Sequence, residues 1–146
     1  MFQYNYINLP SFQINEIITK KIFSEINSHI SLPQNGQVNI VFVSWDEIQN
    51  LNKTYRNKDT LTDVLSFHYF DDFSHIWEDD IAWELVFCEE KILLQWQEYW
   101  LWSEKEFYKL LIHSLLHILW YDHEIDSEYE VMQNFETQIW NKIFEK

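Results

Sequence analysis

Hydrophobic residues along the chain follow two patterns: short runs with strand-like spacing, and longer stretches in which they recur every three or four positions. The short runs predict four strands, at residues 2–7, 38–43, 64–70 and 81–87. The longer stretches predict five helices, at about residues 11–28, 45–55, 89–100, 103–119 and 127–143. Short strands flanked by helices on both sides favour an α+β domain with one small, four-stranded mixed sheet.

Three of the predicted helices begin with a capping box, in which a serine precedes a glutamate by three positions. The three pairs are Ser44 with Glu47, Ser103 with Glu106, and Ser127 with Glu130. A turn is expected at residues 33–36 and a polar loop at residues 56–62. Because the sequence contains no linker or repeat, we expect one domain covering residues 1–146.

The composition is typical of a single folded domain. The chain has 146 residues, of which 47% are apolar and 18% aromatic, and this excludes a disordered or fibrous protein. The lone cysteine, Cys88, cannot form a disulfide within the chain and favours a reducing compartment. Since no apolar run approaches ~18 residues and the first ten residues lack signal-peptide features, we expect a cytoplasmic protein with no membrane partner.

The charge narrows the possible functions. With 24 acidic and 10 basic side chains the formal net charge is −14, which argues against a broad, non-specific nucleic-acid surface but allows a small basic site. Gly36 is the only glycine, so a glycine-rich phosphate loop is excluded. Arg56 is the only arginine, and all other basic residues are lysines.

The predicted helix at residues 103–119 is apolar nearly all round, so we expect it to be buried. A polar stripe interrupts it, formed by Glu106, Lys109, His113 and His117. Residues four apart lie on one helical face, so the two imidazoles could converge on one metal ion. His123 can supply a third ligand if the helix ends near residue 119 and the chain folds back. The resulting spacing, H-x3-H-x5-H, is that of metzincin zinc sites.

Three histidine ligands leave one coordination position open, which is typical of a catalytic zinc. Ser114 stands where zinc peptidases of the H-E-x-x-H type carry their general base, so a peptidase mechanism lacks that group. The alternative interpretation is that these are ordinary, half-exposed histidines.

Two segments resemble the YbeY endoribonuclease family. Residues 113–123, H-S-L-L-H-I-L-W-Y-D-H, are similar to the family signature H-G-x-L-H-L-x-G-Y-D-H. Residues 51–67, L-N-K-T-Y-R-N-K-D-T-L-T-D-V-L-S-F, are similar to the family's L-N-x-x-Y-R-x-K-D-x-P-T-D-V-L-S-F. The chain departs from the family where Leu61 and His68 replace prolines and where Ser114 and Trp120 replace glycines.

The resemblance implies a zinc-dependent, single-strand-specific endoribonuclease. Its implied roles are maturation of the 3′ end of small-subunit ribosomal RNA and ribosome quality control. The implied partners are single-stranded RNA and the small ribosomal subunit with its assembly proteins, and DNA is not expected as a partner. By the same resemblance, His113, His117 and His123 hold one zinc ion per chain.

The second segment implies the groups that contact the substrate. Arg56 matches the functional arginine of the family, and a guanidinium can grip phosphate oxygens with two parallel hydrogen bonds. Lys53 and Lys58 flank it and are expected to help bind RNA. Asp122, next to His123, is expected to orient an imidazole.

Two other functions remain open at this point. One is a zinc hydrolase of another class, such as a peptidase or amidase, although the missing glutamate counts against it. The other is a non-catalytic, zinc-containing ribosome-assembly factor, which the acidic net charge favours. The acidic residues around His75 could bind a cation, but a solvated loop is the simpler interpretation.

Overall fold

The computed structural model of the chain describes residues 3–29, 36–58, 64–69, 77–99, 103–119 and 126–144. Its elements alternate in the first half of the chain and are all helical in the second. In chain order they are β1 (Gln3–Ile7), α1 (Glu16–His29), β2 (Gln37–Val43), α2 (Trp45–Arg56), β3 (Val64–His68), β4 (Ile81–Cys88), α3 (Glu89–Tyr99), α4 (Ser103–Leu119) and α5 (Asp126–Phe144). The α+β class, the four strands and the five helices are therefore confirmed within the described residues.

The sheet is mixed, as expected, and its strand order is β1-β2-β4-β3. β1, β2 and β4 run parallel to one another, whereas β3 pairs antiparallel with β4. β1 and β3 are consequently the two edge strands. Each edge leaves a row of main-chain groups that point away from the sheet.

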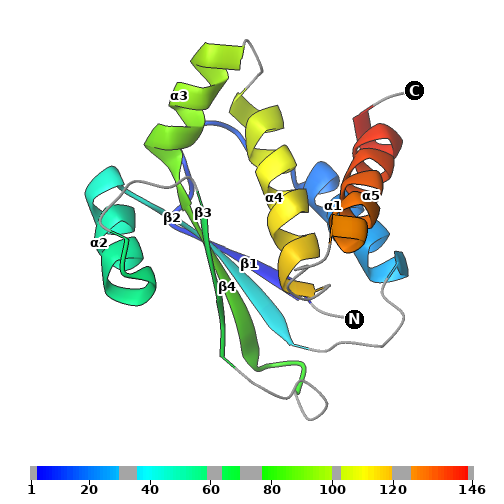
Figure 1. The fold of residues 1–146 in the computed structure, drawn as a ribbon, viewed down its shortest axis with the longest axis horizontal. Helices are drawn as coiled ribbons and strands as arrows, with labels where there is room; N and C mark the ends of the chain where they lie inside the picture. The colour runs from blue at the N-terminus through cyan, green and yellow to red at the C-terminus, as the bar shows by residue number, and fades with distance from the viewer. Residues whose placement is uncertain are drawn as a thin grey trace.

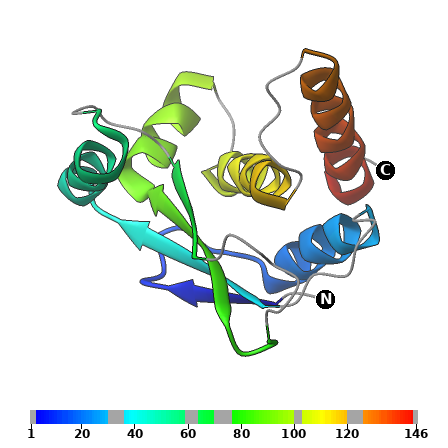
Figure 2. The same cartoon turned by 60° about the horizontal axis from the view of Figure 1, so that its bottom comes forward.

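One face of the sheet carries the main core. Val38, Ile40 and Phe42 of β2 and Leu85 and Phe87 of β4 pack there against α1 and α4. Figure 1 shows α1, α4 and α5 together on one side of the sheet, and Figure 2 shows α5 outside the other two. Alternate residues of the strands face this core, as the period of a β-strand requires.

Among the described elements, α2 packs on the opposite face. Ile48 of α2 packs there against Leu65 of β3 and against Val86 and Cys88 of β4. In Figure 1, α2 lies alone on its side of the sheet. The smaller core fixes α2 against β3, which matters because α2 ends at Arg56.

The first helix begins later than the sequence pattern predicts. We expected it from about residue 11, but α1 begins at Glu16. The side chain of Asn15 accepts hydrogen bonds from the main-chain N–H groups of Ile17 (2.9 Å) and Ile18 (3.4 Å), which is the geometry of a helix N-cap. Ser11 instead contacts the carboxylate of Glu89, so the segment before Asn15 is tied to α3 and not to α1.

The predicted cap of α2 is present. The Ser44 hydroxyl accepts a hydrogen bond from the main-chain N–H of Glu47 (3.3 Å) and donates one to the Glu47 carboxylate (3.1 Å). The side chains of Ser103 and Ser127, which open the other two predicted capping boxes, lie outside the described residues. Among the helices that the structure describes, none is both long and apolar enough to cross a membrane.

Candidate metal and phosphate site

The site is built on α4, which is the most buried helix that the structure describes. Its apolar side chains pack into the main core around most of the helix circumference: Phe107, Tyr108, Leu111, Ile112, Leu115 and Leu116. Ser114 is also buried, and its hydroxyl has no hydrogen-bond partner among the described residues. The exposed stripe that remains is therefore narrow and fixed in position by the core beneath it.

His113 and His117 lie on this exposed stripe. Their ring centroids are 6.4 Å apart and their planes differ by only 13°. This is the arrangement expected of residues one helical turn apart. Both rings thus face solvent from a rigid helix.

Glu136 on α5 contacts His113. Its Oε1 meets Nδ1 of the imidazole, and both side chains are partly exposed. An imidazole whose Nδ1–H donates to a carboxylate presents Nε2 as the free ring nitrogen, the tautomer that binds metals. The sequence analysis missed Glu136, although its spacing from the buried Met132 and Ile139 places it near the face of α5 that packs inward.

Glu106 belongs to the predicted polar stripe but not to its exposed part. The residue is on the same helical face as His113, but its side chain is only 5% exposed. α3 packs against α4, and in Figure 1 it lies beside the first turns of that helix. The stripe is accessible only from Lys109 onward.

The residues fit a metal ion as far as the structure describes them. Two imidazoles one turn apart on a helix can both ligate one zinc ion, with Zn–N distances of ~2.0–2.1 Å. Within the described part of the chain, no group of three or more histidine, cysteine or acidic side chains could hold a metal. The third predicted ligand, His123, and its neighbour Asp122 both lie outside the described residues.

Arg56 is the last residue of α2, and contacts fix the position of both its main chain and its side chain. The next residue, Asn57, has φ 57° and ends the helix in the left-handed conformation that commonly follows a helix. The Arg56 guanidinium donates a 2.7 Å hydrogen bond from Nη2 to the main-chain oxygen of Ser66 on β3. Since an arginine has five N–H donors, this bond leaves others to bind an anion.

The lysines predicted to help Arg56 are both exposed. Lys53 lies in the last turn of α2, and Lys58 lies just beyond it, where its N–H bonds to the oxygen of Asn52 (3.3 Å). The ring of Tyr55 meets Phe67 of β3 edge-to-face at 5.4 Å. These contacts hold the basic end of α2 against the edge strand.

β3 connects the two parts of the site. It packs against α2, which carries Arg56, and against α4, which carries His113 and His117. Ser66 of β3 holds the Arg56 side chain through its main-chain oxygen. Asp59 and Asp63, and most of the acidic segment before Asp80, lie outside the described residues.

Comparison with known proteins gives one consistent result. A family model described as "Endoribonuclease YbeY" matches residues 2–144. A protein of that name from Finegoldia magna is 35% identical over 137 residues, covering 90% of this chain and 87% of its own length. Another, from Macrococcus caseolyticus, is 37% identical over 113 residues, covering 75% of this chain and 73% of its own length.

A solved structure supports the fold independently. The solution structure of TM1509 from Thermotoga maritima has a TM-score of 0.58 and covers 95% of this chain and 90% of its own. The two sequences are 22% identical, so this likeness concerns the fold alone.

Proposed function

The chain belongs to the endoribonuclease YbeY family, and from this premise we propose that it is a zinc-dependent, single-strand-specific endoribonuclease of the cytoplasm. Its proposed roles are 3′-end maturation of small-subunit ribosomal RNA and ribosome quality control. Its proposed partners are single-stranded RNA and the small ribosomal subunit with its assembly proteins.

The observation that carries the proposal is the exposed pair of imidazoles on α4. The rings of His113 and His117 are nearly parallel, and the Glu136 carboxylate contacts His113 through Nδ1, the ring nitrogen other than Nε2. These two residues, together with His123, would hold one zinc ion per chain. A zinc ion bound there supplies Lewis acidity, which polarises a phosphate oxygen or lowers the pKa of a bound water toward ~7.

Arg56 is proposed to bind the scissile phosphate. Its guanidinium is held on Ser66 but is exposed, so the remaining N–H groups can donate to two phosphate oxygens. Such donors stabilise the negative charge that develops on the phosphoryl group in the transition state. Lys53 and Lys58 would add two point charges beside it.

The structure speaks against a peptidase of the H-E-x-x-H type. The residue that follows His113 is Ser114, which is 3% exposed and has a hydroxyl in place of a carboxylate. A buried hydroxyl on the core side of α4 cannot activate a water molecule at the exposed imidazoles. A peptidase or amidase would need a general base from another element.

A non-catalytic role in ribosome assembly is the second candidate, and the net charge of −14 is the observation that favours it. Strong negative charge weakens binding to bare RNA and favours basic protein partners. In this case the zinc would steady the fold without any turnover.

The test combines metal analysis with RNA cleavage. Protein purified without chelator should contain about one zinc per chain, and His117→Ala should lose most of it, whereas His29→Ala, at the end of α1, serves as the control. The parent, but neither His117→Ala nor a chelator-treated sample, should cleave a single-stranded RNA oligonucleotide. Full zinc content in a His113/His117/His123 triple alanine variant would contradict the metal site. A zinc-loaded parent that cleaves neither free RNA nor small-subunit RNA would leave the assembly role as the function.

A further inference from the structure

The outer edge of β1 has main-chain groups that no described residue satisfies. The N–H of Gln3 donates a hydrogen bond to the main-chain oxygen of Gly36, just before β2. In a parallel pair the N–H and C=O groups of every second residue bond to the neighbouring strand, so those of Gln3, Asn5 and Ile7 face β2. Tyr4 and Tyr6 are the residues between, so their N–H and C=O groups point outward. Among the residues that the structure describes, none pairs with this edge, which has the geometry to accept a further strand.

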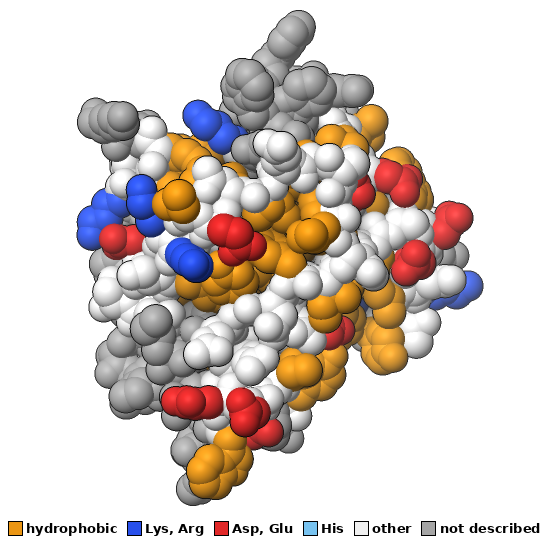
Figure 3. All heavy atoms as spheres, turned by 180° about the vertical axis from the view of Figure 1, so that it is seen from behind, with side chains coloured by type: hydrophobic (Ala, Val, Ile, Leu, Met, Phe, Trp, Pro, Cys, Tyr) orange, Lys and Arg blue, Asp and Glu red, His pale blue; other side chains and the backbone are white. Residues whose placement is uncertain are grey.

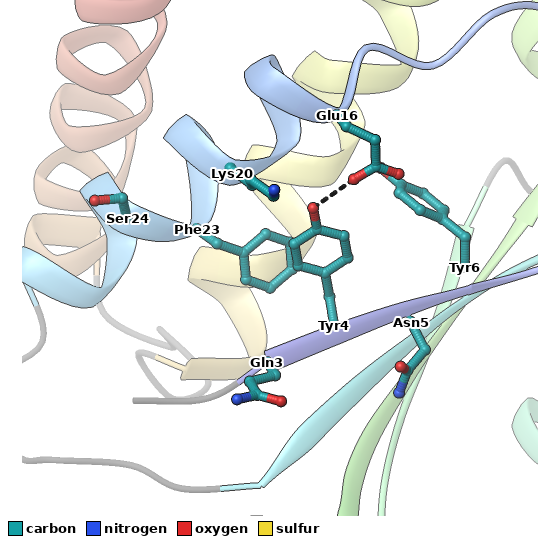
Figure 4. Close-up of a pocket in the computed structure, with 8 residues that line it drawn as sticks. All are labelled: Gln3, Tyr4, Asn5, Tyr6, Glu16, Lys20, Phe23 and Ser24. Carbon is teal, nitrogen blue, oxygen red and sulfur yellow. Dashed lines mark hydrogen bonds between the residues drawn. The ribbon is translucent and has the colours of Figure 1, made fainter.

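An open groove of about 760 Å³ runs along this edge. Residues 3–6 of β1 form one wall, and α1 forms the other through Glu16, Lys20, Phe23 and Ser24. Figure 4 shows Tyr4 and Tyr6 projecting toward α1, with Gln3 and Asn5 on the other side of the strand. Because side chains from both sides of β1 line it, the groove follows the free edge. We call it the β1 groove.

The walls of the β1 groove are ordered and chemically mixed. The rings of Tyr4 and Phe23 stack with centroids 4.6 Å apart, which gives an apolar surface. The Tyr4 hydroxyl donates a 2.7 Å hydrogen bond to the Glu16 carboxylate, and the hydroxyls of Tyr6 and Thr19 are 2.8 Å apart. Figure 3 shows hydrophobic side chains gathered on this side of the molecule, with acidic and basic groups beside them.

We propose that the β1 groove binds an extended, positively charged segment of a partner protein as an additional strand of the sheet. The main chain of that segment would bond to the outward N–H and C=O groups of Tyr4 and Tyr6. An alternate side chain would lie over the Tyr4–Phe23 stack, and a basic side chain would reach the Glu16 carboxylate. A groove between an edge strand and a helix is a geometry that recognises peptides by strand addition.

The charge of the whole chain favours a cationic occupant, since the β1 groove itself is lined by one acidic side chain, Glu16, and one basic side chain, Lys20. The chain carries a net charge of −14, so its field attracts cationic segments and repels a second copy of the same chain. A nucleic acid offers neither the strand-like row of N–H and C=O groups nor the positive charge that would meet Glu16. The inference does not depend on the endonuclease activity.

The probe is a synthetic peptide, acetyl-Lys-Thr-Val-Thr-Lys-Thr-Lys-amide, whose valine and lysines share one face of a strand, with a matched peptide in which glutamate replaces each lysine. On addition of the lysine peptide, hydrogen exchange measured by NMR should slow at the amides of Tyr4 and Tyr6. The amide of Asn5 is already bonded to β2 and should change little. The glutamate peptide should bind at least tenfold more weakly.

A pair of variants tests the location. Ser24→Trp fills the β1 groove from α1 and should weaken binding of the lysine peptide at least tenfold. Ser28→Trp places the same ring one turn further along α1, outside the groove lining, and should bind like the parent. Equal binding of the two peptides, unchanged exchange at Tyr4 and Tyr6, equal effects of the two tryptophans, or self-association through β1 would each overturn the proposal.

Discussion

The Glu136 carboxylate contacts Nδ1 of His113, so a helix near the end of the chain sets the orientation of an imidazole on α4. α5 is held in turn by Met132 and Ile139, which are buried in the main core. Orientation of His113 therefore depends on tertiary packing and not on α4 alone.

If His113 ligates zinc, removal of its carboxylate partner should weaken the metal site. We expect Glu136→Ala to lower zinc affinity by about 10- to 100-fold, the usual effect of losing a carboxylate that orients a ligand histidine. Glu130→Ala, an exposed position on the same helix, is the control and should bind zinc like the parent. Competition with a chromogenic chelator gives the affinity, and ¹⁵N shifts of the His113 ring give the tautomer. An unchanged affinity with an altered tautomer would place His113 outside the metal site.

Arg56→Lys should slow RNA cleavage by about 10- to 100-fold, which corresponds to a loss of about 1.4–2.7 kcal/mol of transition-state stabilisation. Lysine keeps the charge but cannot form two parallel hydrogen bonds to one phosphate. Zinc content should not change, because the residue is on α2 and not on α4. Lys53→Ala and Lys58→Ala should act more weakly and mainly on binding. Steady-state cleavage assays of each variant decide this, and an Arg56→Lys protein as fast as the parent would exclude the bidentate role.

The same assays at several salt concentrations test how much of the chain contacts RNA. Only Arg56, Lys53 and Lys58 are proposed to meet the phosphates, so the slope of log affinity against log salt should correspond to about two or three phosphates. A much steeper slope would require a larger basic surface than these residues provide.

Ser114→Ala should stabilise the protein. The buried hydroxyl has no hydrogen-bond partner among the described residues, and leaving such a group unsatisfied costs about 1–3 kcal/mol. Alanine also has the highest helix propensity. Ser114→Gly, which restores the family residue, should be about 1 kcal/mol less stable than Ser114→Ala because glycine destabilises a helix interior. Urea unfolding of the three proteins measures this order, and a destabilised Ser114→Ala would mean that the hydroxyl is bonded in solution.

The loss of stability at alkaline pH should depend in part on the phenol of Tyr6. Burial raises the pKa of its phenol well above the usual value of about 10, while the hydrogen bond with Thr19 opposes this effect to a lesser degree. The folded state therefore holds the proton more tightly than the unfolded state, and stability falls as the pH rises above about 10. Tyr6→Phe should flatten this fall, whereas Tyr55→Phe, at an exposed position, should not. Melting temperatures at pH 8 to 11 provide the comparison, and parallel curves for parent and Tyr6→Phe would contradict the assignment.

Local patterns predicted the elements well because they depend on neighbours in sequence. The buried alternation of Val38, Ile40 and Phe42 identified β2, and the Ser44–Glu47 cap located the start of α2. The predicted start of α1, at about residue 11, was too early, because Ser11 contacts Glu89, which is distant along the chain. Asn15 performs the capping that Ser11 does not.

The parts that could not be predicted depend on contacts between distant segments. Glu106 follows the same helical spacing as His113, and its burial follows from the packing of other elements on α4, which the helical spacing does not reveal. Glu136 joins the site because α5 folds back onto α4, which no periodicity in either helix reveals. The strand order β1-β2-β4-β3 likewise places β4 between strands that precede it in the chain.

That strand order also separates two binding events. Arg56 is held at the outer edge of β3 and the β1 groove lies at the opposite edge, so three strand spacings, about 14 Å, lie between them. A protein bound along β1 would leave the other edge open to RNA. If that protein itself sits on a ribosomal particle, it would act as a tether and raise the local concentration of the enzyme near RNA ends toward the millimolar range. An acidic chain with few phosphate contacts could then find its substrate through its protein neighbour.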